Sequence, residues 1–395
     1  METPDTTDPF TQQMMPGKQL FFVSEMVPAN THASSAVFYR HFRCLEKEGY
    51  HVTWITDQNS YNDFKSVVPT QWQVTILPNR AWFLPPYRPY GVLQYHRFYY
   101  YYRVLQRELL AAGAGSLLVT YVNGQFMAPF AAFLKARVKL PLISFLHDDV
   151  VELNFFRNKK SLIANTEKIL AASDRVLIAS DAFRRLWPAY ARKFRNLYPI
   201  PEKYTGDRKK VNDHKSLVFG YSGTVYDEVV SSLTSIAAVL DDLGHQMIIV
   251  GNNPKVKEMQ RRYPATVICR EMFDEPAEAN IFLATQCDAA LVAYPEEISE
   301  MPWIATCFPS KFIQYCQLGL PGLVIAPKSS AIGQWCMENR WPLYTQNYQP
   351  SGIAQLASDC INEKTYNAVL HYKDNDFDPD QIQHRFEAVI RELIP

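Results

Sequence analysis

The most informative part of the sequence is Phe308-Pro309-Ser310-Lys311-Phe312-Ile313-Gln314-Tyr315-Cys316-Gln317-Leu318-Gly319-Leu320-Pro321, which runs directly into Gly322-Leu323-Val324-Ile325. The proline and serine at its start open a helix, and the glycine and proline at its end stop that helix before an apolar strand. Unpaired backbone N–H groups and the positive end of the helix dipole point out of the N-terminus at Ser310, where Lys311 adds a full charge. The stretch therefore predicts a site for an anion such as a diphosphate.

Segments of strand length alternate with helical patterns on both sides of this stretch. Before residue 199 we predict strands at 19–24, 51–56, 73–77, 116–121, 142–146 and 175–179, and helices at 34–48, 91–112, 126–136 and 161–172. After residue 215 we predict strands at 216–221, 246–250, 266–268, 288–293 and 323–325, a short helix ending at 262, and helices at 229–242, 276–286 and 331–339. Such alternation indicates parallel sheets covered by helices on both faces.

The alternation is interrupted at residues 199–215, where prolines, a glycine and a run of polar residues predict an exposed connector. A chain of 395 residues is also long for one hydrophobic core. We therefore expect an α/β fold of two Rossmann-like, doubly wound domains that face a cleft. The expected divisions are a disordered tail at 1–17, a first domain at 18–200, a second domain at 216–375, and a C-terminal helix at 376–395 that crosses back to the first domain.

Composition excludes several classes of function. Lysine plus arginine and aspartate plus glutamate each number 40, so no bulk charge favours nucleic-acid binding. The seven cysteines show no CxxC pair, which is typical of reduced thiols in the cytoplasm. Residues 1–17 lack the pattern of a signal peptide, and no apolar run approaches the ~20 residues of a transmembrane helix. We expect a cytoplasmic protein whose contact with a membrane, if it makes one, is peripheral.

A second phosphate-binding element is predicted at Gly220-Tyr221-Ser222-Gly223-Thr224, where the first strand of the second domain ends in a tight turn. Glycine lets the backbone approach a phosphate, and the hydroxyls of Ser222 and Thr224 can donate to its oxygens. The turn is not the dinucleotide-binding fingerprint, because the second and third glycines of that motif fall on Ser222 and Tyr226. A purely structural turn is the alternative.

The order of these elements resembles the nucleotide-binding half of glycosyltransferase family 4 and related families of the GT-B fold. The donor-binding segment of that family often has the pattern Pro-x-Lys-x-x-Glu-Tyr-x-x-x-Gly-x-Pro, which residues 309–321 match except that Gln314 replaces the glutamate. The resemblance covers residues 217–346 well and the first half of the chain in outline. It implies that the first domain binds the acceptor, that the second binds a nucleoside diphosphate sugar as substrate, and that no cofactor takes part.

The resemblance also implies roles for individual residues. The donor diphosphate would be held by Ser222, Gly223, Thr224, Ser310 and Lys311. Gln314 would bind the ribose hydroxyls, and Arg270 and Met272 occupy the place where such enzymes usually hold the base. The first glutamate of the family's Glu-x7-Glu pair falls on Thr306, which would contact the donor sugar or acceptor, and Glu296, Glu297 or Glu300 is a candidate to replace the missing carboxylate. A solvated acidic loop is the alternative for most of these glutamates.

In the first domain, the strand at 142–146 delivers His147-Asp148-Asp149 to its carboxyl end. With a near-neutral pKa and a neighbouring carboxylate, His147 is placed to remove a proton from an acceptor hydroxyl or to bond the donor sugar, and many family 4 members have a histidine-aspartate pair here. A capping or loop role is the alternative. Asp148 and Asp149 also resemble the manganese site of GT-A enzymes, but that fold has no second βα series, so we expect no metal.

Two further features each carry two interpretations. The first turn, residues 25–32, lacks the paired glycines usual in the family. Either the acceptor and diphosphate are approached differently, or Thr31 and His32 supply side-chain contacts where other members use backbone, with His32 a candidate to contact the donor sugar or acceptor. A plain surface histidine is the alternative for His32. Residues 82–103 are rich in tyrosine and arginine, which suits saccharide stacking or peripheral contact with a membrane. Packing of an ordinary α/β helix is the alternative there.

The sequence thus predicts a metal-independent glycosyltransferase of hexosyltransferase type. It would move a sugar from a nucleoside diphosphate donor to a hydroxyl of a glycan, lipid-linked or small-molecule acceptor, in glycan, polysaccharide or glycoconjugate biosynthesis. We expect it in the cytoplasm or at the inner face of the membrane, and the resemblance favours retention of anomeric configuration. The alternatives are a nucleotide-sugar epimerase of the same architecture and a non-catalytic glycosyltransferase-like binding subunit.

Overall fold

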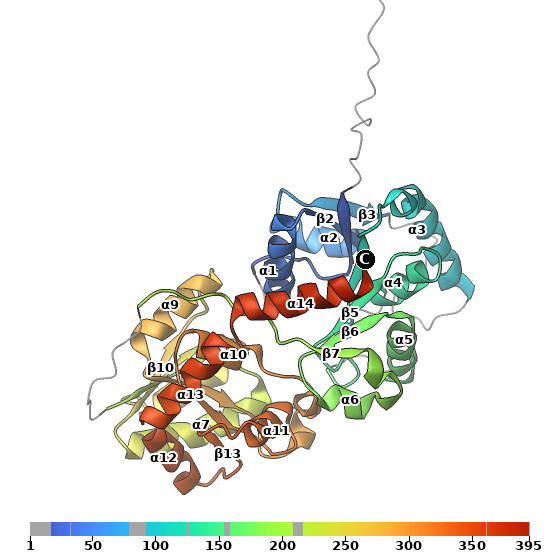
Figure 1. The fold of residues 1–395 in the computed structure, drawn as a ribbon. Helices are drawn as coiled ribbons and strands as arrows, with labels where there is room; N and C mark the ends of the chain where they lie inside the picture. The colour runs from blue at the N-terminus through green and yellow to red at the C-terminus, as the bar shows by residue number, and fades with distance from the viewer. Residues whose placement is uncertain are drawn as a thin grey trace, which may run out of the picture.

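The computed structural model of the chain describes residues 17–31, 33–78, 92–123, 126–153, 159–207, 216–360 and 362–394. These residues form two α/β domains, each built on its own parallel sheet with helices packed against it (Figure 1). The second domain has one large hydrophobic core, whereas the first is filled by three smaller clusters. The fold class expected from the sequence is therefore confirmed.

Within the described ranges, the first sheet has seven parallel strands in the order β3-β2-β1-β4-β5-β6-β7. The strands are β1 (Lys18–Val23), β2 (Tyr50–Asp57), β3 (Gln73–Leu77), β4 (Leu117–Tyr121), β5 (Leu142–Leu146), β6 (Arg175–Ile178) and β7 (Phe194–Asn196). The helices of this domain are α1 (Ala33–Lys47), α2 (Gln58–Phe64), α3 (Val92–Ala111), α4 (Met127–Lys135), α5 (Lys159–Ala172), α6 (Ala182–Leu186) and a 3₁₀ helix (Pro188–Lys193).

The described part of the second domain has six parallel strands in the order β10-β9-β8-β11-β12-β13. The strands are β8 (Val218–Ser222), β9 (Gln246–Val250), β10 (Val267–Arg270), β11 (Ala289–Ala293), β12 (Gly322–Ile325) and β13 (Tyr344–Thr345). The helices are α7 (Asp227–Asp242), α8 (Pro254–Arg262), α9 (Pro276–Gln286), α10 (Ser310–Gln317), α11 (Ala331–Glu338), α12 (Pro350–Asp359) and α13 (Glu363–Asp374), with 3₁₀ helices at Ile298–Glu300 and Pro302–Ala305.

The central strands of both sheets are apolar on both faces, as a parallel sheet between two helical layers requires. All five residues are buried in each of β4, β5 and β11. In the first sheet β1 pairs with β2 and β4, and in the second β8 pairs with β9 and β11. The strand order therefore reverses beside β1 and beside β8, and the crevices that bind ligands in such sheets open at the carboxyl ends of these strands.

The last helix, α14 (Pro379–Leu393), packs on the first domain although it follows the second in the chain (Figure 1). Its apolar side chains Ile382, Phe386 and Ile390 are buried in the same cluster as the aromatic core of α1. Burial of each such side chain contributes about 1.5–3 kcal/mol. The Oε1 atom of Gln383 on α14 accepts a hydrogen bond from the ring of His41 on α1 at 2.8 Å. The two domains are thus joined by α14 as well as by the connector.

The tyrosine- and arginine-rich segment lies partly outside the described residues, because 79–91 are not among them. On α3, Phe98 and Tyr101 are buried in the core, whereas Tyr95 and Tyr99 are exposed. The guanidinium of Arg97 is buried and lies 4.2 Å from the ring centroid of Phe126. Tyr100 and Tyr102 are partly buried against the same core, so packing explains four of the six described aromatic residues of this segment. Among the described helices, none is long and apolar enough to cross a membrane.

Candidate functional site

The N-terminus of α10 has no side-chain cap. Its N-cap residue is Pro309, whose ring offers no acceptor, so the first backbone N–H groups of the helix remain available to a ligand. Phe312, Ile313 and Tyr315 on the same helix are buried. Because these side chains anchor the helix in the core, its N-terminus has a fixed position.

Lys311 carries a charge that no carboxylate of the described residues neutralises. Its Nζ atom donates a hydrogen bond to the Tyr221 hydroxyl at 2.9 Å and lies 4.0 Å from the centroid of the same ring. A phenol orients the ammonium group without cancelling its charge. The ammonium group, the helix dipole and the uncapped N–H groups therefore all favour an anion at this point.

The turn after β8 lies against Lys311. Gly223 has a φ of +110°, a backbone conformation that residues other than glycine rarely adopt. A Cβ atom built on Gly223 would lie 3.9 Å from Lys311 Nζ. The backbone N–H of Ser222 donates to the hydroxyl of Tyr315 at 3.0 Å. Tyr315 thus ties the turn to α10, so that two elements far apart in the sequence form one phosphate-sized cradle.

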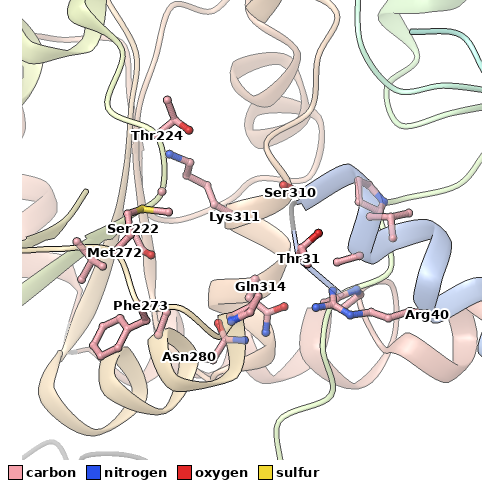
Figure 2. Close-up of a pocket in the computed structure, with 18 of the residues that line it drawn as sticks. Thr31, Arg40, Ser222, Thr224, Met272, Phe273, Asn280, Ser310, Lys311 and Gln314 are labelled. Carbon is pink, nitrogen blue, oxygen red and sulfur yellow. The ribbon is translucent and has the colours of Figure 1, made fainter. Parts of the chain in front are cut away.

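These elements border a pocket of about 450 Å³ between the two domains (Figure 2). The second domain contributes the turn after β8, the start of α10, and residues of the β10–α9 region. The first domain contributes Thr31, Ala36, Val37 and Arg40 from the β1–α1 region, and the connector contributes Pro199, Ile200 and Pro201. The pocket therefore joins the carboxyl-end turns of the two central strands, β1 and β8.

Solved structures resemble this arrangement over nearly the whole chain, although no known protein-family profile and no curated protein matches the sequence. HepE of Anabaena in complex with UDP and glucose superposes with a TM-score of 0.63 at 14% identity, over 95% of this chain and 100% of that one. A glycosyltransferase from Rickettsia africae gives a TM-score of 0.64 at 9% identity, over 95% and 98%. TarM of S. aureus in complex with fondaparinux, α-GlcNAc-glycerol and UDP gives 0.59 at 8% identity, over 95% and 99%. The chain has the GT-B fold.

The interdomain pocket of this GT-B fold contains most of the residues predicted to bind the donor. All five predicted diphosphate ligands line it, namely Ser222, Gly223, Thr224, Ser310 and Lys311. Two of the three predicted nucleoside residues, Met272 and Gln314, line it as well. Arg270 does not: its side chain is exposed at the end of β10, with the guanidinium 4.8 Å from the ring centroid of Phe282.

Gln314 is already engaged by the connector. Its Oε1 atom accepts from the backbone N–H of Glu202 at 2.8 Å, and its Nε2 atom donates to the backbone carbonyl of Glu202 at 3.1 Å. An amide has a second N–H and a further lone pair, so these remain for a ribose hydroxyl. The residue expected to bind ribose also attaches α10 to the connector between the domains.

Three residues that no sequence motif indicates complete this side of the pocket. The Glu202 carboxylate accepts from Asn280 Nδ2 at 2.8 Å and lies 3.7 Å from the guanidinium of Arg40. Arg40 also donates to the carbonyl of Ile200 at 3.0 Å, and burial lowers its pKa while Glu202 raises it. Arg40 and Asn280 both line the pocket. Their shared partner is a connector residue, which a pattern of sequence spacing cannot reveal.

The predicted catalytic pair lies beside the pocket rather than in its lining. His147 is buried, and burial together with the nearby His41 lowers its pKa to about 3, well below the near-neutral value expected from the sequence. Its Nε2 atom has no hydrogen-bond partner among the described residues. The Asp148 carboxylate accepts a hydrogen bond from the Tyr121 hydroxyl, and burial raises its pKa. His147 is therefore a neutral imidazole at physiological pH.

Thr306 belongs to a contact between the domains. It is buried, and its hydroxyl donates to Asp149 Oδ2 at 3.3 Å. The backbone N–H of Asp149 donates to the thiol sulfur of Cys307 at 3.2 Å. The loop that follows β5 is thus attached to the segment that leads into α10, which brings His147 and Asp148 close to the donor side of the GT-B cleft.

The remaining candidates lie elsewhere. Glu296 lines a different pocket of about 530 Å³, together with Glu300 and residues of α7 and α12. His32 lies outside the described residues, whereas its neighbour Thr31 lines the interdomain pocket. Across the described part of the chain, no three His, Cys, Asp or Glu side chains are grouped so that they could hold a metal ion.

Proposed function

We propose that this chain is a glycosyltransferase that moves a sugar from a nucleoside diphosphate sugar to a hydroxyl group of an acceptor. The observation that carries the proposal is the uncompensated charge of Lys311 at the uncapped start of α10, beside the glycine turn and inside the interdomain pocket. A pyrophosphate bridges these groups well, since it offers several anionic oxygens to one ammonium group and to neighbouring N–H donors.

The known complexes of similar folds support the choice of donor. HepE was solved with UDP and glucose, and TarM with UDP and α-GlcNAc-glycerol. We infer a uridine or guanosine diphosphate sugar as donor and a glycan, lipid-linked or small-molecule hydroxyl as acceptor. We place the reaction in the cytoplasm or at the inner face of the membrane, as a step of glycan or glycoconjugate biosynthesis.

The chemistry follows from charge and position. When the bond between sugar and phosphate breaks, negative charge grows on the departing diphosphate, and Lys311 with the N–H groups of α10 stabilises it without a metal ion. Loss of one such preorganised donor typically lowers kcat by about 100- to 1,000-fold. The cleft between the domains brings the acceptor to the sugar and excludes water. We favour retention of configuration at the sugar carbon.

An epimerase of the same architecture has less support. Such an enzyme needs acid and base carboxylates in the cleft, and Asp274 is the single carboxylate among the described residues that line the pocket. His147 is also buried and neutral, which does not favour the repeated uptake and release of protons by which an epimerase would isomerise a nucleotide sugar without an acceptor.

The test compares Lys311→Met with Lys257→Met, a matched change at an exposed lysine on α8. A ligand at a hundred times its Kd stabilises a protein by about 2.7 kcal/mol. We expect UDP or GDP to raise the Tm of the wild type and of Lys257→Met, but not that of Lys311→Met. If neither UDP nor GDP binds the wild type, the proposal is contradicted. Binding without transfer of sugar to any acceptor in a panel, and without hydrolysis, indicates the non-catalytic subunit.

A further inference from the structure

Tyr226 is a large aromatic side chain that the core does not bury. It directly precedes α7 as the N-cap residue, without capping the helix through its side chain. It is 41% exposed and lines the interdomain pocket. Its hydroxyl has no hydrogen-bond partner among the described residues, whereas tyrosines that pack in a core usually have one. Core packing therefore does not explain this residue.

The ring of Tyr226 is held from one side by Trp303. Trp303 lies in the 3₁₀ helix Pro302–Ala305 and meets Tyr226 edge-on, with ring centroids 5.8 Å apart and an interplanar angle of 68°. Such an edge-to-face contact favours one orientation of the ring. Tyr226 therefore presents a fixed aromatic surface to the pocket.

Tyr226 lies in the pocket close to the residues of the proposed phosphate cradle. In Figure 2 the side chain of Lys311 runs toward Thr224, and Phe273 and Asn280 lie on the opposite side of it. Tyr226 follows Thr224 by two residues and lies near Tyr221, whose hydroxyl accepts the hydrogen bond from Lys311. A ligand with its base near Phe273 and its phosphates at Lys311 therefore directs the group on its second phosphate toward Tyr226.

A carboxylate of the first domain lies near Tyr226. Burial and, after it, the charge of Asp148 raise the pKa of the Tyr226 phenol. Asp148 is partly exposed and is oriented by the Tyr121 hydroxyl. An aromatic face next to a carboxylate suits a sugar ring, whose C–H groups form an apolar face and whose hydroxyls can donate to the carboxylate.

We propose that the ring of Tyr226, braced by Trp303, is the platform on which the sugar ring of the donor stacks. This inference rests on the proposed function and deepens it, because it assigns the sugar to a particular side chain. Tyr226 is the binding residue, and Trp303 is a positioning residue that acts through it. The base and the diphosphate do not contact either ring.

The test separates sugar binding from nucleotide binding. Calorimetry on the full chain measures a separate Kd for each ligand: UDP, UDP-glucose, UDP-N-acetylglucosamine, GDP and GDP-mannose. The proteins compared are the wild type, Tyr226→Phe, Tyr226→Leu and Trp303→Leu. We expect Tyr226→Leu to weaken the nucleotide sugar about tenfold while the matching diphosphate stays within twofold of the wild type. Trp303→Leu should weaken only the nucleotide sugar, by about threefold, and Tyr226→Phe should match the wild type for both ligands.

Several outcomes overturn the platform. Equal weakening of diphosphate and nucleotide sugar by Tyr226→Leu means that the ring contacts the nucleotide. Unchanged affinities mean that it contacts no part of the donor, and a loss in Tyr226→Phe as large as in Tyr226→Leu means that the hydroxyl, not the ring, is what matters. Diphosphate binding by each variant verifies that the pocket is folded. A wild type that binds no diphosphate rejects the proposed function itself, whereas the outcomes above reject only the platform.

Discussion

The side chain of Gln314 pairs with the backbone of Glu202 through both of its amide atoms, at 2.8 Å for the N–H of Glu202 and 3.1 Å for its carbonyl. Gln314 belongs to the helix that forms the anion site, and Glu202 belongs to the connector between the domains. The Glu202 carboxylate extends the contact to Asn280 and Arg40. The anion site and the connection between the domains are therefore one structural unit.

Because of this pairing, we expect Gln314→Leu to lower the free energy of unfolding by more than the same change at an exposed glutamine does. The substitution leaves the N–H and the carbonyl of Glu202 without partners, and each unsatisfied group costs about 1–3 kcal/mol where water cannot replace the bond. We expect a lower free energy of unfolding in urea and a broader distribution of domain orientations in small-angle scattering. The matched control is Gln355→Leu, at an exposed position on α12. Equal stability of the two variants contradicts the role of this pair.

Gly223→Ala should separate backbone strain from ligand binding when it is compared with Gly244→Ala. Gly223 has a φ of +110° and Gly244 a φ of +69°, and no atom lies within 4 Å of a Cβ built on Gly244. A residue other than glycine that is held at a positive φ lowers the free energy of unfolding by about 1–3 kcal/mol. We expect both variants to be less stable in urea, but only Gly223→Ala to bind UDP or GDP at least tenfold more weakly, since only its strained turn lies beside Lys311 in the pocket. Diphosphate binding that survives in Gly223→Ala refutes the assigned cradle.

The hydroxyl of Tyr315 should matter more for stability than another buried hydroxyl in the same domain. Tyr315→Phe removes the acceptor for the Ser222 N–H, at a cost of about 1–3 kcal/mol. Tyr344→Phe is the control, because the Tyr344 hydroxyl is a buried atom without a partner among the described residues, and its removal should be neutral or stabilising. Urea unfolding measures both effects. Similar losses in the two variants show that the turn after β8 does not depend on Tyr315.

His41 should make the protein less stable in acid. Burial, more than any other cause, lowers its pKa from 6.5 to about 4, although its bond to Gln383 opposes the shift. Below pH 6.5 the unfolded chain takes up a proton that the folded chain takes up only near pH 4. Stability therefore falls as the pH drops through this window, by about 1.4 kcal/mol per pH unit and roughly 3 kcal/mol in total.

The measurement compares the wild type with His41→Asn by urea unfolding at pH values from 7.5 to about 4. The asparagine amide can still donate to Gln383 but does not titrate in this range. Burial raises the pKa values of Glu25, Asp148 and Asp149, which act in the opposite direction, but these groups are shared by both proteins and cancel in the difference. If the free energies of unfolding of the two proteins change with pH in parallel, the predicted contribution of His41 is wrong.

Local sequence signals indicated both segments of the candidate anion site, because each segment is a short element with a recognisable pattern. Ser310 and Lys311 open α10, and Gly223 lies in the turn between β8 and α7, and turn chemistry and helix caps mark such positions. The helices α12 and α13 were not predicted. Their polar surfaces obscure the helical period, and burial of Ile353, Leu356 and Val369 against the second core stabilises them.

The local environment of the other candidates could not be predicted. The low pKa of His147 comes from burial and from His41, a residue more than a hundred positions away in the sequence. Thr306 contacts Asp149 across the domain boundary, and Glu296 faces a separate pocket because its loop turns toward α7 and α12. Desolvation and contact between distant segments depend on how the domains pack, and residue spacing contains no information about that.

By itself, the sequence determined the two α/β domains and the uncapped start of α10 where we propose that an anion binds, since apolar periodicity, helix caps and glycine turns act over a few residues. Tertiary structure alone decided that Arg40, Glu202 and Asn280 meet beside Gln314, that Tyr226 faces the pocket, and that His147 is neutral. These properties arise where the two domains and the connector meet. Their energies depend on distances through space and on exclusion of water, which are set only when the chain has folded.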